Sequence, residues 1–129
     1  MLFKRVDVLV KGLKTHKWIV NSVTTFEDMQ ELVGGYANRL TLPNNIDLWL
    51  NGKNSHGAMH DELGMNLLLI WDKESKYYQP IYGPVFLAGK NNDGEVDELT
   101  GSQRYWIAQH LKIAHLNNGQ ILTAIDLSN

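Results

Sequence analysis

The sequence predicts an α+β domain in which a small, mostly antiparallel sheet packs against two main helices. Two capping boxes predict the helix starts, because a Thr followed three residues later by Glu or Gln satisfies free backbone N–H groups. Short Val- and Leu-rich runs between Gly, Pro and Asn turns predict the strands. We expect helices at about residues 24–34 and 101–116, with a further short helix near residues 63–71.

The chain is expected to begin with a β-hairpin. Residues 3–10 alternate loosely between apolar and polar side chains, which is typical of a strand. Lys11-Gly12 begins a turn, and residues 16–21 form the returning strand.

The first main helix has clear start and stop signals. Thr24 and Glu27 have the spacing of a capping box, and apolar residues follow at helical intervals. Gly34-Gly35 ends the helix, because glycine readily adopts the left-handed conformation that closes the last turn. Tyr36 lies just past this exit, where it can fold back on the helix.

The middle of the chain combines short strands with a polar loop. Strands are expected at residues 39–42 and 46–50. The second of these places Asp47 and Trp49 on one face, since side chains alternate along a strand. Residues 51–63 form the main exposed loop, and the apolar run after it is interpreted as the short buried helix, with a strand as the alternative.

The last third contains a long extended segment, a hairpin and a helix. Residues 77–89 are extended, with a bend at Gly83-Pro84, and residues 91–94 form a hairpin turn. Thr100 and Gln103 form the second capping box. Residues 117–129 are a tail whose apolar part adds an edge strand or pairs with another subunit.

Composition favours one soluble domain over residues 1–129. With 129 residues, 43% hydrophobic and 20% charged, the chain is long enough for a core of its own. It contains no Cys, which excludes disulfides, thiolate catalysis and cysteine-bound metals. Its start lacks the apolar run of a signal peptide, and the longest apolar run is far too short to span a membrane. We expect a cytoplasmic protein.

The charge balance does not favour a nucleic-acid partner. Net charge is −2 and the pI is about 6.2, whereas binding to phosphates usually requires a basic excess. Basic residues do gather near the N-terminus, at Lys4, Arg5, Lys11, Lys14 and Lys17. We interpret them as the solvated face of a strand and keep nucleic-acid association as an alternative.

Residues 56–62 contain the most metal-like stretch. His56 and His60 have the i, i+4 spacing that lets two imidazoles share a metal on one helix face, and Asp61 follows. Gly57 lies between them in an expected loop, however, and the Glu of a zinc-protease motif is missing. A polar loop is therefore the preferred interpretation, with a small metal-dependent hydrolase as the alternative, and we expect no cofactor.

The remaining motifs favour structure over chemistry. His110 is interpreted as a hydrogen-bonded core residue and His115 as the C-terminal residue of a helix, where positive charge is favourable. Gly34-Gly35 closes a helix, whereas a phosphate loop opens one. Residues 91–95 lack the oxygen ligands of a calcium loop, and no nucleophile elbow is present.

Aromatic side chains supply the candidate binding residues. Core packing accounts for most of them, but those close to Arg, Gln or Asn are suited to bind a base or to form an interface. The candidates of this kind are Tyr36, Arg39, Trp49, Tyr77, Tyr78, Tyr82, Arg104 and Tyr105.

Two separated segments resemble one family. Residues 29–36 followed by Leu42-Pro43 are similar to the opening signature of the DUF3846 family, and residues 81–89 with 93–95 and 99–103 are similar to its closing segment. The resemblance covers about residues 6–110, so the loop at 51–63 and the tail are elaborations of a single DUF3846-like domain. Asn66 stands where the family often places an Asn before a short apolar helix, which adds it to the candidates.

This resemblance implies a setting but no catalytic residues. Family members resemble small proteins of bacteriophages, prophages and mobile elements, which implies the cytoplasm of a bacterial host. Our hypothesis is a non-catalytic accessory protein, used in counter-defence, that sequesters a nucleotide-type signalling molecule or occupies a host protein. A homo-oligomer would help, because a small domain makes a pocket more readily between subunits.

Overall fold

The computed structural model describes residues 2–55 and 62–128, which form two α-helices and two β-sheets. The helices are α1 (Phe26–Val33) and α2 (Gly101–His110). The strands are β1 (Leu2–Lys11), β2 (Ile19–Thr25), β3 (Ala37–Leu42), β4 (Ile46–Asn51), β5 (Met65–Asp72), β6 (Tyr77–Tyr82), β7 (Val85–Lys90), β8 (Val96–Asp97), β9 (Leu111–His115) and β10 (Ile121–Asp126). The α+β class predicted from the sequence is confirmed.

The strands divide between two sheets, where the sequence pattern predicted one. Sheet A has the order β2-β1-β7-β4-β3, with β8 paired to β7, and its strand pairs are antiparallel. Sheet B has the order β6-β5-β10-β9. It is mixed, because β10 runs parallel to β5 and antiparallel to β9.

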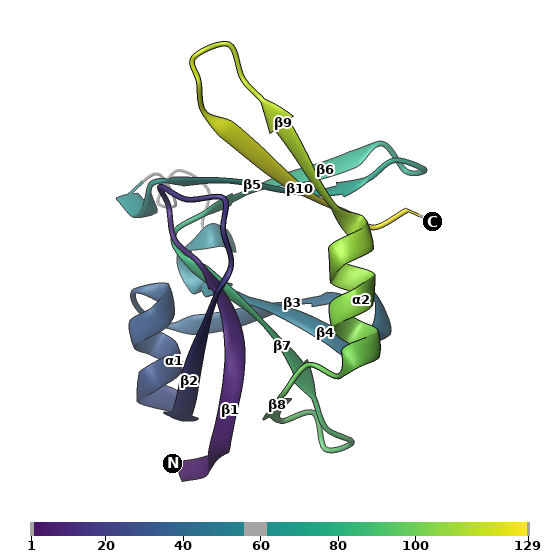
Figure 1. The fold of residues 1–129 in the computed structure, drawn as a ribbon. Coiled ribbons are helices and arrows are strands. Elements are labelled where there is room, and N and C mark those ends of the chain that lie inside the picture. Colours follow the sequence, from purple (N-terminus) through teal and green to yellow (C-terminus); the bar gives the residue numbers. More distant parts are fainter. Residues whose placement is uncertain (1, 56–61, 129) are drawn as a thin grey trace.

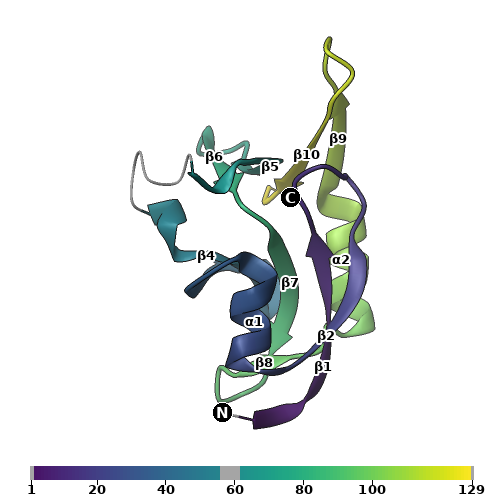
Figure 2. The ribbon, with the colours of Figure 1, turned by 90° about the vertical axis from the view of Figure 1, so that its left-hand side faces the viewer.

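Sheet A separates two apolar cores. Alternation along β7 places Leu87 on one face and Phe86 on the other, and both are fully buried. Phe86 packs with Met29 of α1, whereas Leu87 packs with Ile107 of α2 and with residues of sheet B. The two helices therefore lie on opposite sides of sheet A, and sheet B closes one end of the α2 side (Figures 1 and 2).

Helix α1 begins one residue later than its predicted capping box. Thr25 is the N-cap and forms the reciprocal pair with Asp28, in place of the predicted Thr24 and Glu27. The Asp28 carboxylate also accepts hydrogen bonds from Thr24, chiefly from its backbone N–H, and these lower the pKa of Asp28. The predicted end is confirmed, since Gly34 has a φ of 77° at the C-cap.

Helix α2 is shorter than predicted. Its capping box of Thr100 and Gln103 is confirmed, but the helix ends at His110 instead of residue 116, because the next five residues pair with β10 as β9. His110 stacks on Trp106 and its Nδ1 lies 2.6 Å from the Asp126 carbonyl oxygen, so it is hydrogen-bonded as predicted, but it is half-buried and not a core residue. His115, predicted at a helix end, is instead exposed on a strand.

The short helix predicted near residues 63–71 is a strand, β5. This apolar run lies in the interior of sheet B between β6 and β10, where both neighbours hydrogen-bond to it. The tail was predicted to add an edge strand or to pair with another subunit. Its strand β10 is instead an inner strand of the same chain.

The extended segment predicted at residues 77–89 is two strands in different sheets. Gly83, with a φ of 80°, forms the predicted bend and carries the chain from β6 in sheet B to β7 in sheet A. The predicted hairpin follows, with β8 returning along β7.

Lys11, a buried residue of sheet A, connects the two sheets by hydrogen bonds to Asn66 of sheet B. Lys11 was predicted in a turn on a solvated face, but it is the last residue of β1 and is only 1% exposed. Its ammonium donates to the backbone oxygen of Asn66 at 2.6 Å and to the side-chain oxygen at 2.5 Å. Asn66, itself buried, donates to the Gly83 carbonyl at 2.8 Å. Burial lowers the pKa of Lys11 to about 8.

Candidate ligand-binding site

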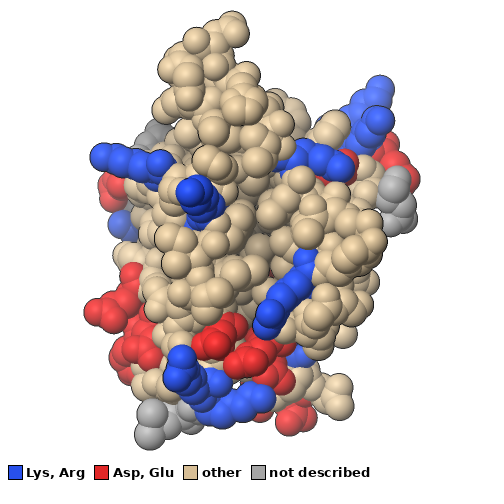
Figure 3. All heavy atoms as spheres, viewed as in Figure 1, with Lys and Arg blue, Asp and Glu red and all other residues tan. Residues whose placement is uncertain are grey.

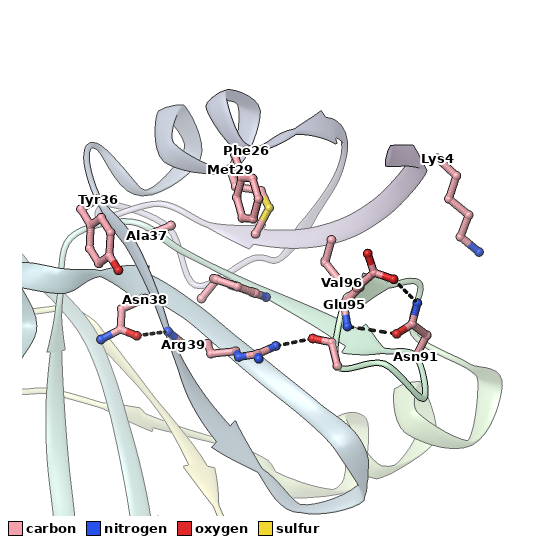
Figure 4. Close-up of a pocket in the computed structure, with 12 residues that line it drawn as sticks. Lys4, Phe26, Met29, Tyr36, Ala37, Asn38, Arg39, Asn91, Glu95 and Val96 are labelled. Atoms are coloured by element: carbon pink, nitrogen blue, oxygen red, sulfur yellow. Dashed lines mark hydrogen bonds between the residues drawn. The ribbon is translucent and has the colours of Figure 1, made fainter. Parts of the chain in front are cut away.

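A pocket of about 490 Å³ opens on the α1 side of sheet A. It lies between α1, the start of β3 and the hairpin that joins β7 to β8 (Figure 4). Its volume is within the range of small-molecule sites. The lining residues are Lys4, Phe26, Met29, Tyr36, Ala37, Asn38, Arg39, Trp49, Asn91, Gly94, Glu95 and Val96.

The charge beside this pocket comes from β4. Alternation along β4 turns Asp47 toward the α1 side, while its neighbours Ile46 and Leu48 face the other core. Asp47 is fully buried, so its carboxylate needs partners. Arg39 Nη1 lies 3.3 Å from Asp47 Oδ2, and Lys90 Nζ lies 3.3 Å from Oδ1.

The contact with Asp47 helps to hold the Arg39 guanidinium over the ring of Trp49. The Arg39 Cζ atom lies 5.5 Å from the centroid of the Trp49 ring, within the range of a cation–π contact. Nη1 also donates to the Gly94 carbonyl at 2.7 Å. Both side-chain hydrogen bonds of Arg39 to described residues therefore use Nη1. The other guanidinium N–H groups are left for solvent or a ligand.

Trp49 packs against a second aromatic ring and has an indole N–H without an acceptor among the described residues. It stacks on Phe86 with a centroid separation of 6.0 Å and is 8% exposed. Its indole N–H is buried and has no acceptor among the described residues. Buried polar groups almost always have a partner, and this donor is one of three buried side-chain atoms of the described residues that lack one, with Trp18 Nε1 and Thr123 Oγ1.

Two exposed aromatic rings form the walls of the pocket. Phe26 of α1 is 44% exposed and Tyr36 is 73% exposed, which is unusual for side chains of this size. Tyr36 lies against Gly52, where an added Cβ would come within 2.9 Å of the tyrosine ring. Beyond Tyr36, a second hollow of about 460 Å³ extends toward Gly34 and Lys53.

The far side of the pocket carries paired charges. The Lys4 ammonium lies 2.9 Å from the Asp97 carboxylate. Their hydrogen bond raises the pKa of Lys4 and lowers the pKa of Asp97. Glu95 accepts a hydrogen bond from the Asn91 amide at 3.3 Å, so these side chains offer polar groups without a large net charge.

Three of the nine residues predicted from the sequence meet in this pocket, namely Tyr36, Arg39 and Trp49. Tyr77 and Tyr78 are exposed on β6 at the edge of sheet B, and Tyr82 ends that strand. Arg104 and Tyr105 lie on the exposed surface of α2. Asn66 is the buried partner of Lys11 and lines none of these hollows.

The two alternative sites of the sequence analysis have different outcomes. His56, His60 and Asp61 lie outside the described residues. Residues 2–55 and 62–128 contain no cluster of three side chains suited to a metal.

The N-terminal cations do not form one free surface, because Lys11 is buried and Lys4 and Arg5 contact carboxylates. In the described part of the chain, neither helix is long and apolar enough to cross a membrane.

Two residues in or beside the pocket, Phe26 and Asp47, were not predicted as part of a site. Asp47 was placed beside Trp49 on the correct face, but its two cationic partners come from β3 and β7. The available signal was a charged residue inside the apolar run Ile46–Leu50. Such a residue is buried only when it is paired. Phe26 belongs to the apolar face predicted for the first helix, yet it is 44% exposed and lines the pocket.

The comparisons with known proteins identify a family but no activity. The family model DUF3846, described as a domain of unknown function, matches residues 8–112. This range includes Arg39, Asp47, Trp49 and Lys90, and it ends within β9. No curated protein and no solved structure gives a significant match to the chain.

Proposed function

This chain belongs to the DUF3846 family, a domain of unknown function, and we propose that it acts by binding a small ligand without catalysis. The ligand we propose has a planar ring and an acceptor or anionic group, as a nucleotide has. The observation that carries the proposal is the Arg39 guanidinium, held over Trp49 by the buried Asp47.

Preorganisation supports binding at this position. An arginine fixed in advance loses little side-chain entropy when it meets a ligand. Asp47 and the Gly94 carbonyl both hold Nη1, so the rest of the guanidinium is presented in a constant orientation. Arginine is well suited to carboxylate and phosphate groups, because its N–H donors match their geometry.

The aromatic walls support a planar ligand. Tyr36 and Phe26 expose ring surface at the pocket, and bases stack on such rings with little dependence on sequence.

The charges favour binding over proton transfer. Asp47, the carboxylate closest to Arg39, is fully buried and contacts two cations, so it is poorly placed as a general base. Arg39, Lys90 and Asp47 together carry one net positive charge, which suits a ligand with a single anionic group.

The biological setting extends the proposal by association. The family resemblance to phage and mobile-element proteins leads us to propose a counter-defence role, in which the protein sequesters a nucleotide-type signal of a bacterial host. A fold or a family does not by itself define a function, so this extension depends on what the pocket holds.

The test combines recovery of a ligand with matched variants. The purified protein is incubated with a bacterial nucleotide extract, washed and denatured, and the released molecules are identified by mass spectrometry. Thermal unfolding is then measured with adenosine monophosphate, cyclic dinucleotides and ADP-ribose, since a ligand that binds the folded state raises the Tm. We expect a ring-containing anion to be recovered and to stabilise the protein.

Tyr36→Ala should weaken that binding by about tenfold, the effect of losing one stacking contact. Tyr105→Ala is the matched control, because it removes a similarly exposed tyrosine from α2, at 66% against 73% exposure. If nothing is recovered and none of the probes raises the Tm, the sequestration proposal is wrong.

A further inference from the structure

Each edge strand of sheet A has an outward backbone donor that a side chain already engages. The Asn21 side chain on β2 accepts a hydrogen bond from the Ser22 backbone N–H at 3.0 Å. The Asn38 side chain on β3 accepts one from the Arg39 N–H at 2.9 Å. A backbone donor engaged in this way is withdrawn from a second strand, which is one means by which proteins limit edge-to-edge association.

One edge of sheet B is closed in the same manner. The Asn54 side chain bonds both backbone groups of Tyr82 at the end of β6, accepting from the N–H at 2.9 Å and donating to the carbonyl at 2.8 Å. Pro80, in the middle of β6, has no N–H to offer.

The other edge of sheet B, strand β9, has an open backbone. The Leu116 N–H donates to the Gln120 carbonyl at the hairpin turn. Because hydrogen bonds alternate along an antiparallel pair, the backbone of Ala114 then faces β10, while that of Ile113 and His115 faces outward. Among the described residues, no side chain bonds to these outward groups of Ile113 and His115.

Strand β9 leads into a projecting arm. The β9–β10 hairpin extends beyond the rest of the molecule (Figures 1 and 2). Residues 113–125 contain no Asp, Glu, Lys or Arg, and the arm shows no charged atoms in the view of Figure 3. The one charged residue of β9 is Lys112, next to Ile113, which lies at the centre of the strand and is 55% exposed. An open edge strand with an exposed apolar side chain at its centre promotes association.

We propose that this edge binds a second copy of the chain, with β9 pairing antiparallel to β9 of the copy about a twofold axis at Ile113. Sheet B would then continue across the two subunits. The pairing is self-complementary, as a twofold interface requires. It places Lys112 opposite Ala114 and Leu111 opposite His115, so no like charges are directly opposite, and the two Lys112 side chains are diagonal neighbours about 7–8 Å apart.

The proposed interface lies in sheet B, at the edge strand β9. This inference is independent of the pocket, which lies on the α1 side of sheet A.

The oligomeric state is the direct test. Sedimentation velocity over a range of concentrations should give twice the chain mass of 14.7 kDa. Ile113→Lys should give the monomer, because two lysines would meet at the twofold axis. Val20→Lys is the matched control, since Val20 is similarly exposed on the closed edge β2, and it should leave the dimer intact. Circular dichroism verifies that each variant is folded.

A cysteine variant tests the register of the pairing. The chain has no Cys, so Ile113→Cys introduces a single thiol. Hydrogen-bonded pairs have Cα atoms about 5.5 Å apart, a separation that a disulfide can span. Mild oxidation should therefore link two chains through residue 113 but not through Val20→Cys. A wild-type chain that is monomeric at every concentration, or an Ile113→Lys variant that still dimerises, would overturn the proposal.

Discussion

Sheet A and sheet B differ in how their polar side chains and the backbone groups of their edge strands are paired. In sheet A the buried charge of Asp47 is paired with two cations and both edge strands carry a capping Asn. In sheet B one edge is closed by Asn54 and Pro80, while β9 is open and exposed at the base of a projecting arm. This contrast underlies our two proposals, a ligand pocket on sheet A within one chain and a contact between two chains at sheet B.

The largest expected difference between the sheets concerns their aspartates. Asp47→Ala should lower the free energy of unfolding by about 4 kcal/mol, because two hydrogen bonds to a charged group, each worth about 2 kcal/mol, are lost at a fully buried position. Asp126→Ala in sheet B should cost about 1 kcal/mol, the scale of the ordinary hydrogen bonds that it accepts from Ser128. Urea unfolding measures both. Equal costs would show that the Asp47 cluster has no special structural role.

A smaller effect on the free energy of unfolding is expected at Lys11, which joins the two sheets. The pKa of Lys11 is about 8 in the folded chain and 10.5 in its ordinary environment. Between these values the unfolded chain binds the additional proton, so the free energy of unfolding should rise with pH, by at most about 3 kcal/mol. Below pH 8 both states are protonated and the cost of the buried charge is fully present.

The measurement compares the wild type with Lys11→Met from pH 7 to 10.5. The difference between the two proteins isolates Lys11 from the tyrosines, which also titrate near the upper limit. The wild type should gain stability relative to the variant as the pH rises. A constant difference would mean that Lys11 keeps its proton in the folded state throughout this range.

The smallest effect on stability is expected at a closed edge. Asn21→Val frees the Ser22 N–H beside the exposed Ile19 and Val20, so β2 becomes an open edge like β9. We expect less than about 1 kcal/mol change in the free energy of unfolding, but new concentration-dependent association. Introducing Asn21→Val into the Ile113→Lys variant separates this association from pairing at β9. If the double variant remains monomeric, the Asn21 bond is not what closes this edge.

Part of the candidate site could be predicted from the sequence. Alternation along residues 46–50 correctly placed Asp47 beside Trp49, because the side-chain period of a strand is local. The partners of Asp47 could not be predicted, since Arg39 and Lys90 reach it through the pairing of β4 with β3 and β7. Tyr105 has an aromatic ring like that of Tyr36, but only the tertiary structure separates an α2 surface from a pocket wall.

The sequence by itself determined the features that depend on a few neighbouring residues. These are the capping box of Thr100 and Gln103, the left-handed end of α1 at Gly34, and the bend at Gly83. Each follows from the backbone preferences and local hydrogen bonds of adjacent residues.

Only the tertiary structure decided the features that depend on distant partners. The run at residues 65–72 suits a helix or a strand, and it is a strand because β10 supplies a parallel neighbour from the end of the chain. Residues 111–115 leave the predicted helix because the same β10 pairs with them. A backbone hydrogen bond can be satisfied within a helix or across a sheet, and long-range pairing decides between the two.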